Sequence, residues 1–306
     1  MVTTAPRQPP QTTSLDVTGP YDLGEVALMG FGHRDERHFD GVLRLTFCLE
    51  PDLETPVGVE VRQLGEQVEL TVHPPGDSPL DAAQLRAVST QVARVVSLDH
   101  DGSAYAEVCG RDPVLARLHA VAPGFRPALF HSAYEALIWS VLSARRSRTQ
   151  AIPLRERLGE QLGSTFQLAG RPTVAVPTPS RLRTLEALPG LPADRVPRLH
   201  AIADAALAGR LSTSRLHGLA PEEAAAQLQQ LPGIGPFYAS LVVVRALGHA
   251  DVLAAGESHG AEAVARLYGL EAPPGPGDLE RLAEAWRPYR TWVQVAARAL
   301  GDRLPR

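Results

Sequence analysis

Apolar and β-branched residues form short runs between residues 15 and 75, and Gly, Pro and Asp separate these runs. The pattern is typical of β-strands and predicts strands at 41–49, 57–64 and 67–74. The connection Leu-Gly-Glu-Gln between the last two runs is short, so we expect them to form a hairpin. Residues 80–98 instead carry apolar side chains at helical spacing. This part of the chain is therefore predicted to form a small antiparallel sheet covered by a helix.

The strand pattern ends after residues 99–105, and every later candidate element is helical. Pro and Gly clusters separate the candidates, so many short helices are expected rather than a regular bundle. The predicted helices lie at 112–121, 132–146, 149–162, 179–187, 195–208, 221–230, 236–248, 258–268 and 278–300. The predicted fold class is α+β, with a disordered tail at 1–14, an α/β sheet domain at 15–107 and an all-helical domain at 108–306.

Composition places the chain among ordinary globular proteins. Of its 306 residues, 44% are apolar and 21% are charged, which is enough apolar material for one large core or two smaller ones. The first residues are rich in Thr, Pro and Gln, which favours a disordered tail over a targeting peptide. Cys48 and Cys109 are the only cysteines, so a disulfide framework and a four-cysteine metal or iron–sulfur site are excluded. We expect a cytoplasmic protein.

The charges are divided unevenly along the chain. The net charge is −4, but residues 1–125 hold nine Arg against 18 Asp and Glu, whereas residues 126–306 hold 21 Arg against 16. This asymmetry is a modest indication of a phosphate-facing surface on the second part, although chance could also produce it. All 30 basic residues are arginine. The absence of lysine excludes a Walker P-loop and any Schiff-base mechanism through a lysine side chain.

The stretch LPGIGPFYASLVVVRALG, residues 231–248, contains a tight turn followed directly by an apolar helix. Gly233 and Gly235 permit positive φ and leave backbone amides uncovered by a Cβ, and Pro236 suits the first position of the next helix. The exposed amides and the unsatisfied amides of the helix start would form an anion pocket that accepts a phosphodiester. The alternative is an ordinary turn between helices that packs and binds nothing.

This stretch resembles the helix-hairpin-helix element of the DNA glycosylase superfamily, and most closely its alkylpurine branch, the 3-methyladenine DNA glycosylase II family. The resemblance covers nearly the whole chain, because segments similar to the family occur in the family's order, at 130–151, 188–203, 251–260 and 286–300. It implies a sheet domain like half of a TATA-binding protein, followed by a helical glycosylase core. The hairpin residues implied to bind DNA are Gly233, Ile234, Gly235 and Pro236.

The resemblance also implies a catalytic carboxylate. The family has an aspartate at the start of the helix that follows the hairpin, and counting along residues 251–260 places Glu257 there. Cleavage of an N-glycosidic bond builds positive charge at the sugar, which a fixed carboxylate stabilises, and a helix N-terminus favours the ionised acid. The longer glutamate side chain displaces the carboxylate oxygens, which puts its efficiency in doubt. Alternatively, Glu257 only caps the helix or is solvated.

Further residues are assigned to a base pocket by the same resemblance. Phe237 follows the hairpin and could stack on an extruded base, or it could be a plain core aromatic. Tyr238 stands where the family usually has threonine, and Arg298 stands where its best-known branch has a pocket tryptophan. Leu241 and Trp292 complete the expected pocket. The departures mean that the family's substrate range does not carry over directly.

A loop rich in arginine occupies the place where the family carries a glutamine and an apolar wedge that fills the gap left by the flipped nucleotide. This chain has Ala144, Arg145 and Arg146 there. A guanidinium can stack in such a gap and can also hold phosphate. Arg145, Arg146 and Arg148 are therefore expected to bind DNA, with a solvated basic face as the alternative.

The leading hypothesis is a monofunctional DNA glycosylase that excises alkylated bases of the 3-methyladenine and 7-methylguanine type from duplex DNA in base excision repair. Without lysine it would leave an intact abasic site. One alternative is a DNA-lesion-binding protein that kept the scaffold and lost turnover, and another is a helical scaffold that ignores DNA. The expected partner is damaged double-stranded DNA, with no membrane, for a cytoplasmic, nucleoid-associated bacterial monomer. No metal site and no cofactor are expected, beyond a monovalent cation that the hairpin backbone carbonyls could hold.

Overall fold

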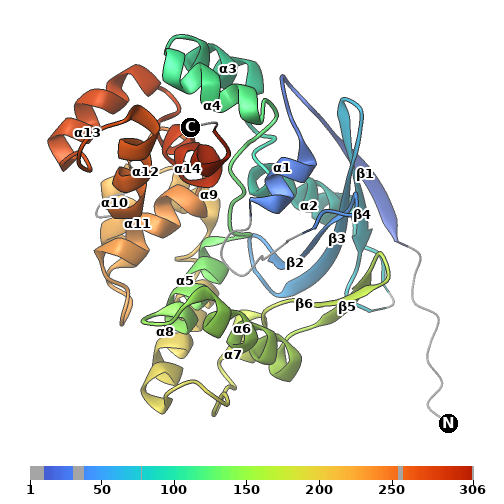
Figure 1. The fold of residues 1–306 in the computed structure, drawn as a ribbon. Helices are drawn as coiled ribbons and strands as arrows, with labels where there is room; N and C mark the ends of the chain where they lie inside the picture. Colours follow the sequence, from blue (N-terminus) through green and yellow to red (C-terminus); the bar gives the residue numbers. More distant parts are fainter. Residues whose placement is uncertain (1–9, 30–37, 77, 254–257, 305–306) are drawn as a thin grey trace.

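An antiparallel sheet forms the first part of the molecule. The computed structural model describes residues 10–29, 38–76, 78–253 and 258–304 (Figure 1). The four strands pair in the order β1-β4-β3-β2. Their bounds are Gln11–Asp16 for β1, Leu43–Leu49 for β2, Thr55–Leu64 for β3 and Gln67–His73 for β4. The three predicted strands are confirmed, and so is the predicted hairpin, since β3 and β4 pair with Leu64 opposite Gln67.

One face of the sheet forms a core with two helices, α1 (Leu23–Leu28) and α2 (Ala82–Val95). Alternate residues of each strand point to this face, as the period of two requires. They meet the apolar side of α2. A capping box of Asp81 and Gln84 fixes the start of α2. The predicted helix at 80–98 is confirmed, whereas α1 was not predicted from the sequence.

The first residues of the sheet correct the predicted tail. Residues 11–14, expected to be disordered, belong to β1, which pairs with β4 from Gln11 opposite Val72 to Asp16 opposite Gln67. The Gln11 side chain also exchanges two hydrogen bonds with the backbone of Leu80. Every second side chain of β1 is exposed. An edge strand held largely by main-chain hydrogen bonds needs little apolar patterning, which is why the sequence did not reveal it.

Short helices form most of the rest of the molecule, as predicted, and in the part of the chain that the structure describes none is long and apolar enough to cross a membrane. Their bounds are α3 Gly102–Gly110, α4 Pro113–Val121, α5 Ala133–Ser143, α6 Arg148–Leu162, α7 Pro179–Leu182, α8 Val196–Leu207, α9 Thr213–His217, α10 Pro221–Leu228, α11 Pro236–Arg245, α12 Ser258–Tyr268, α13 Pro276–Ala283 and α14 Arg290–Leu300, with 3₁₀ turns η1 Ala193–Arg195, η2 Glu284–Trp286 and η3 Gly301–Arg303.

The helices correct two of the predicted boundaries. The division between 107 and 108 falls inside α3, whose Tyr105 and Cys109 pack in one apolar cluster with α4, α12 and α14. The single helix predicted at 278–300 is divided into α13 and α14 by η2 and the following Arg287–Pro288 segment. Proline lacks the amide hydrogen that a continuous helix needs, so Pro288 interrupts the helix. The apolar pattern continues across this break, which is why the sequence predicted a single helix.

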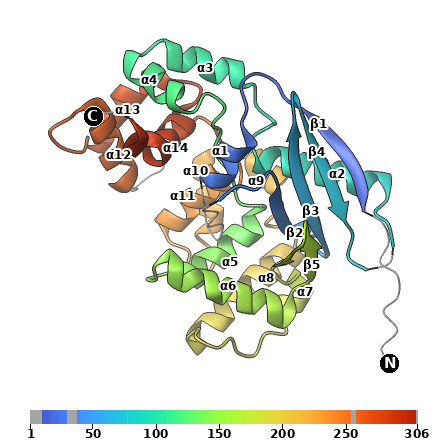
Figure 2. The same cartoon turned by 45° about the vertical axis from the view of Figure 1, so that its right-hand side comes forward.

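A second small sheet corrects the expectation that residues 108–306 are entirely helical. Strands β5 (Thr165–Leu168) and β6 (Arg171–Val174) form an antiparallel hairpin beside β2 and β3 (Figure 2). Thr46 Oγ1 in β2 donates a hydrogen bond to the carbonyl of Val174 at 3.0 Å. Each strand has four residues, and a hairpin of that size depends on packing against other elements. Its local pattern was therefore too short to predict strands.

Candidate functional site

The hairpin predicted at residues 231–235 joins α10 to α11. Gly233 has φ +83°, so the predicted positive φ is confirmed there. Gly235 does not share it: with φ −90° and ψ 179° it is the extended N-cap residue of α11, and Pro236 follows at the first helical turn. A Cβ at Gly235 would meet nothing within 4 Å, so open space lies in front of it. Its lack of a side chain leaves the first amides of α11 uncapped and accessible to a ligand.

Ile234, which was predicted to bind DNA, points inward instead. Its side chain is buried in the core that includes α5, α8 and α11, and its amide donates to the carbonyl of Leu231 at 3.1 Å. The apolar side chain anchors the turn, because only this orientation removes it from water. The surface available to a ligand therefore comes from Gly233, Gly235 and the start of α11.

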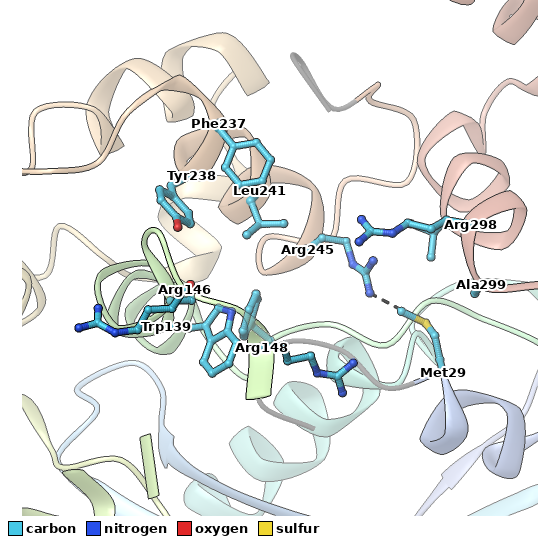
Figure 3. Close-up of a pocket in the computed structure, with 13 residues that line it drawn as sticks. Met29, Trp139, Arg146, Arg148, Phe237, Tyr238, Leu241, Arg245, Arg298 and Ala299 are labelled. Carbon is cyan, nitrogen blue, oxygen red and sulfur yellow. Dashed lines mark hydrogen bonds between the residues drawn. The ribbon is translucent and has the colours of Figure 1, made fainter. Parts of the chain in front are cut away.

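A cavity of about 520 Å³ lies beside the first turns of α11 (Figure 3). Three of the five residues predicted for a base pocket reach it from α11, namely Phe237, Tyr238 and Leu241, and Arg298 reaches it from α14. Phe237 is 48% exposed, although it is a large aromatic residue. The remaining lining residues are Met29, Phe130, Trp139, Ser143, Arg146, Arg148, Arg245, Val295 and Ala299. Segments widely separated in the sequence therefore build the cavity together.

Trp292, the fifth residue predicted for the pocket, does not line this cavity. Its side chain is 3% exposed and packs in an aromatic cluster with Tyr105, Tyr289 and His100, at ring-centroid distances of 5.1, 5.0 and 5.2 Å. Trp292 and Arg298 are six residues apart on α14, which corresponds to about 1.7 helical turns. They therefore face different sides of the helix, and Trp292 belongs to the core.

Trp139 on α5 is a cavity residue that the sequence did not reveal. Figure 3 shows its indole on the α5 side of the cavity, with Phe237, Tyr238 and Leu241 on the α11 side. All residues of α5 from Ala133 to Leu142 are buried. Because the helix is apolar on nearly every face, its pattern could not indicate which side faces the cavity.

Four arginines border the cavity, and three of them were predicted: Arg146 and Arg148 as DNA-binding residues and Arg298 as a pocket residue. Arg146 and Arg148 come from the start of α6 and the loop before it. Arg245 at the end of α11 is buried, donates to the carbonyl of Ala128 and lies 3.9 Å from the sulfur of Met29. Among the lining residues that the structure describes, no carboxylate is present. The described walls of the cavity are thus aromatic, apolar and positively charged.

Arg145 does not line the cavity but stands at the tip of the loop between α5 and α6. Its φ is +57°, a left-handed conformation that costs a non-glycine residue about 1–2 kcal/mol. The Arg145 side chain is exposed, whereas that of Arg146 is half-buried and donates to the carbonyl of Gly190 at 3.2 Å. The adjacent arginines therefore differ: one supports the loop and the other projects from it.

The predicted catalytic residue Glu257 lies outside the described residues. On the side that precedes it, Asp251 forms ion pairs with Arg287 at 2.7 Å and Arg290 at 2.8 Å. The amide of Val252 donates to Thr291 Oγ1 at 2.9 Å. These contacts tie the chain before Glu257 to the start of α14. On the other side, α12 begins at Ser258, so the predicted start of the next helix is confirmed.

His259, two residues beyond Glu257, is a surface residue. Its side chain is 70% exposed, and its Nδ1 lies 3.3 Å from a carboxylate oxygen of Glu262 one turn further along α12. Among the described residues, no group of three or more His, Cys, Asp or Glu side chains is arranged to hold a metal ion.

Sequence comparison finds relatives among DNA repair enzymes, although no family model matches the chain. It is 29% identical over 217 residues to a probable bifunctional transcriptional activator/DNA repair enzyme AlkA of Mycobacterium tuberculosis, covering 70% of this chain and 42% of the relative. It is 30% identical over 185 residues to DNA-3-methyladenine glycosylase 2 of Escherichia coli, covering 58% of this chain and 61% of the relative. The chain thus spans less than two thirds of the length of these curated relatives.

Structural comparison extends over the whole fold. The 3-methyladenine DNA glycosylase from Archaeoglobus fulgidus superimposes with a TM-score of 0.76, covering 95% of this chain and 98% of the other at 19% identity. The chain therefore has the fold of the helix-hairpin-helix DNA glycosylases. The fold class predicted from the sequence, an antiparallel sheet followed by a helical glycosylase core, is confirmed. The hairpin and the cavity share α11.

Proposed function

We propose that this protein is a DNA glycosylase that removes alkylated bases of the 3-methyladenine and 7-methylguanine type from duplex DNA. The observation that carries the proposal is that α11 contributes both to the hairpin and to the cavity. Its N-terminus presents uncapped amides behind the open face of Gly235, and its first turns place Phe237 and Leu241 in the cavity. A strand phosphate held at the amides would bring the adjoining nucleotide to the mouth of that cavity.

The walls of the cavity suit a planar base. Stacking of a base on an aromatic side chain contributes about 1–3 kcal/mol. Trp139 and Phe237 offer rings from two different helices. A nucleotide rotated out of the duplex would exchange its base-stacking partners for these rings. The size, about 520 Å³, lies within the range of small-ligand sites.

For catalysis, we assign the carboxylate to Glu257 on sequence grounds alone. Its charge would stabilise the sugar cation that develops as the N-glycosidic bond breaks. An alkylated purine with a positively charged ring leaves readily, so little acid catalysis is needed. The chain has no lysine with which to form a Schiff base and cut the strand. The proposed product is therefore a free base and an intact abasic site.

Arg145 is proposed to fill the gap that the rotated nucleotide leaves. Its exposed side chain stands at the tip of the loop next to Arg146, which borders the cavity. A planar guanidinium can stack between bases and can also contact the phosphates on either side. An arginine would thus take the place of the apolar wedge that the family resemblance implies. We propose that the protein acts on damaged double-stranded DNA as a monomer.

A monovalent cation at the hairpin carbonyls remains a proposal. The Leu231 carbonyl accepts one hydrogen bond from the Ile234 amide and retains a second lone pair, which would be one of the oxygen ligands of such a cation. Such an ion would bridge the turn to a phosphate and strengthen binding without taking part in bond cleavage. Comparing duplex affinity in potassium and in tetramethylammonium chloride at equal ionic strength tests this: a stronger affinity in potassium is expected.

The proposed function is tested by incubating the purified protein with methylated duplex DNA and measuring the free bases released. We expect release by the wild type and loss of at least about 100-fold in Glu257→Gln, because a neutral amide cannot stabilise the sugar cation. Glu262→Gln is the matched control, since Glu262 is an exposed carboxylate of α12 beside His259. The control should retain activity. Equal activity in Glu257→Gln and the wild type would contradict the assignment.

A lesion-binding protein without turnover is the second candidate. The observation that favours it is the set of four arginines at the cavity, together with the absence of a carboxylate among its described lining residues. The same experiment separates the two functions. Tight binding to methylated duplex DNA with no base released above background would establish the sensor and exclude the glycosylase.

A further inference from the structure

The end of α5 is capped by a guanidinium from a distant segment. Arg195, in the 3₁₀ turn η1, donates from Nη1 to the carbonyl of Val141 at 2.8 Å and to the carbonyl of Ala144 at 3.0 Å. The last carbonyls of a helix have no donors within the helix and form the negative end of its dipole. A cation that binds two of them fixes where the helix ends and how the next residues leave it.

A second tether holds the other side of the same loop. The Arg146 guanidinium donates to the carbonyl of Gly190, at 3.2 Å, and to that of Leu142, at 3.5 Å. Residues 190–195 are thus linked to the loop at two points, once through Arg195 and once through Arg146. The loop is bound on both sides of its tip.

Arg145 is the residue between these tethers. Its φ of +57° is unfavourable for a residue with a Cβ, and such a conformation persists when the surrounding structure imposes it. Arg195 donates to the carbonyl of Ala144, the preceding residue. The side chain of Arg146, the following residue, donates to the carbonyl of Gly190. The exposed side chain of Arg145 contributes no hydrogen bond to this arrangement among the contacts that the structure describes.

We propose that Arg195 is a positioning residue that keeps Arg145 projecting before DNA binds, so that nucleotide extrusion uses a preformed wedge. This inference rests on the proposed function, in which Arg145 enters the duplex. A loop ordered in advance loses little conformational freedom on binding, so more of the contact energy is available to unstack the target base. Without the cap, Arg145 could relax from the left-handed conformation and its side chain would leave the tip.

The test compares a lesion that must be extruded with one that need not be. Arg195→Met keeps an unbranched stem of similar flexibility and removes every donor. On a fully paired duplex we expect its excision rate to fall by about 10- to 100-fold, as for other small misplacements of reacting groups. On the same lesion inside an unpaired bubble, where no base pair has to be opened, we expect the rate of the wild type. A 2-aminopurine in place of the lesion reports extrusion by its fluorescence, and its signal on duplex binding should be smaller with Arg195→Met than with the wild type.

Two control variants separate positioning from general stability. Arg195→Lys can still donate to both carbonyls and should restore most of the duplex activity. Arg181→Met removes a similar contact, because Arg181 donates to the carbonyl of Gly163 at the far end of α6 at 3.2 Å. It should excise both substrates like the wild type.

Two results would overturn the inference. One is an unchanged duplex rate in Arg195→Met, and the other is an equal loss on the duplex and the bubble, which indicates a structural role. Failure of the proposed function has a different signature, since the wild type would then release no base from either substrate. In that case the 2-aminopurine signal on duplex binding still compares Arg195→Met with the wild type, and equal signals would overturn the inference.

Discussion

Replacing Gly235 with alanine should weaken DNA binding while leaving the fold intact. Gly235 has φ −90°, which any residue adopts, and an added Cβ would meet nothing within 4 Å. Alanine there restricts the unfolded chain, so the free energy of unfolding should stay the same or rise by up to about 1 kcal/mol. The methyl group would stand in the space through which a phosphate approaches the amides of α11. A lost charge-assisted hydrogen bond costs about 1.5–3 kcal/mol, or about 10- to 100-fold in affinity.

The neighbouring Gly233 provides the contrasting variant. Its φ of +83° and the Arg198 guanidinium, 2.8 Å from an ideal Cβ, both oppose a side chain. Gly233→Ala should therefore lower the free energy of unfolding, by about 1–2 kcal/mol from the backbone strain alone. Urea unfolding measures this quantity, and fluorescence anisotropy with a labelled duplex at several salt concentrations measures affinity. If folded Gly235→Ala bound duplex within twofold of the wild type, the amides of α11 would not be the phosphate site.

Two further predictions concern the cavity and a stacked histidine pair. Trp139 borders the cavity, whereas Trp286 and Trp292 are buried elsewhere. A change in tryptophan fluorescence on lesion binding should therefore disappear in Trp139→Phe and persist in Trp292→Phe. The opposite result would place the base elsewhere. Burial, with His217 stacked at 4.4 Å, holds the pKa of His249 below its usual 6.5, so the unfolded chain binds the proton more readily. The stabilisation is present above pH 6.5 and decreases below it. The urea concentration at the unfolding midpoint should therefore decrease as the pH is lowered from 7.5 to 5.5, and it should decrease less in His249→Asn. An equal decrease in both proteins would contradict the assignment.

Local signals were sufficient for much of the fold and for the hairpin. The alternating runs predicted β2, β3 and β4, and the two-residue connection at Gly65 and Glu66 predicted their hairpin. The Gly and Pro residues of 231–236 predicted the turn and the start of α11. These features depend on φ preferences and on periodicity within a few residues, and both can be read directly from the sequence.

Other features depended on packing between distant segments. Strands β5 and β6 form against β2 and β3, and β1 is held mainly by pairing with β4, so neither carries a strong pattern of its own. The sequence could not assign Trp139 to the cavity or Trp292 to the core, because both stand on helices with several apolar positions. Arg195 gave no local sign that it caps α5, more than 50 residues earlier in the chain.

The sequence by itself determined strands β2, β3 and β4, most of the helices and the turn before α11, because steric limits on φ and the burial of apolar stripes act over short distances. The tertiary structure decided which face of each helix borders the cavity and which arginine supports a loop rather than projecting from it. Those choices follow from the close packing of side chains that are far apart in the chain, and no single segment contains that information.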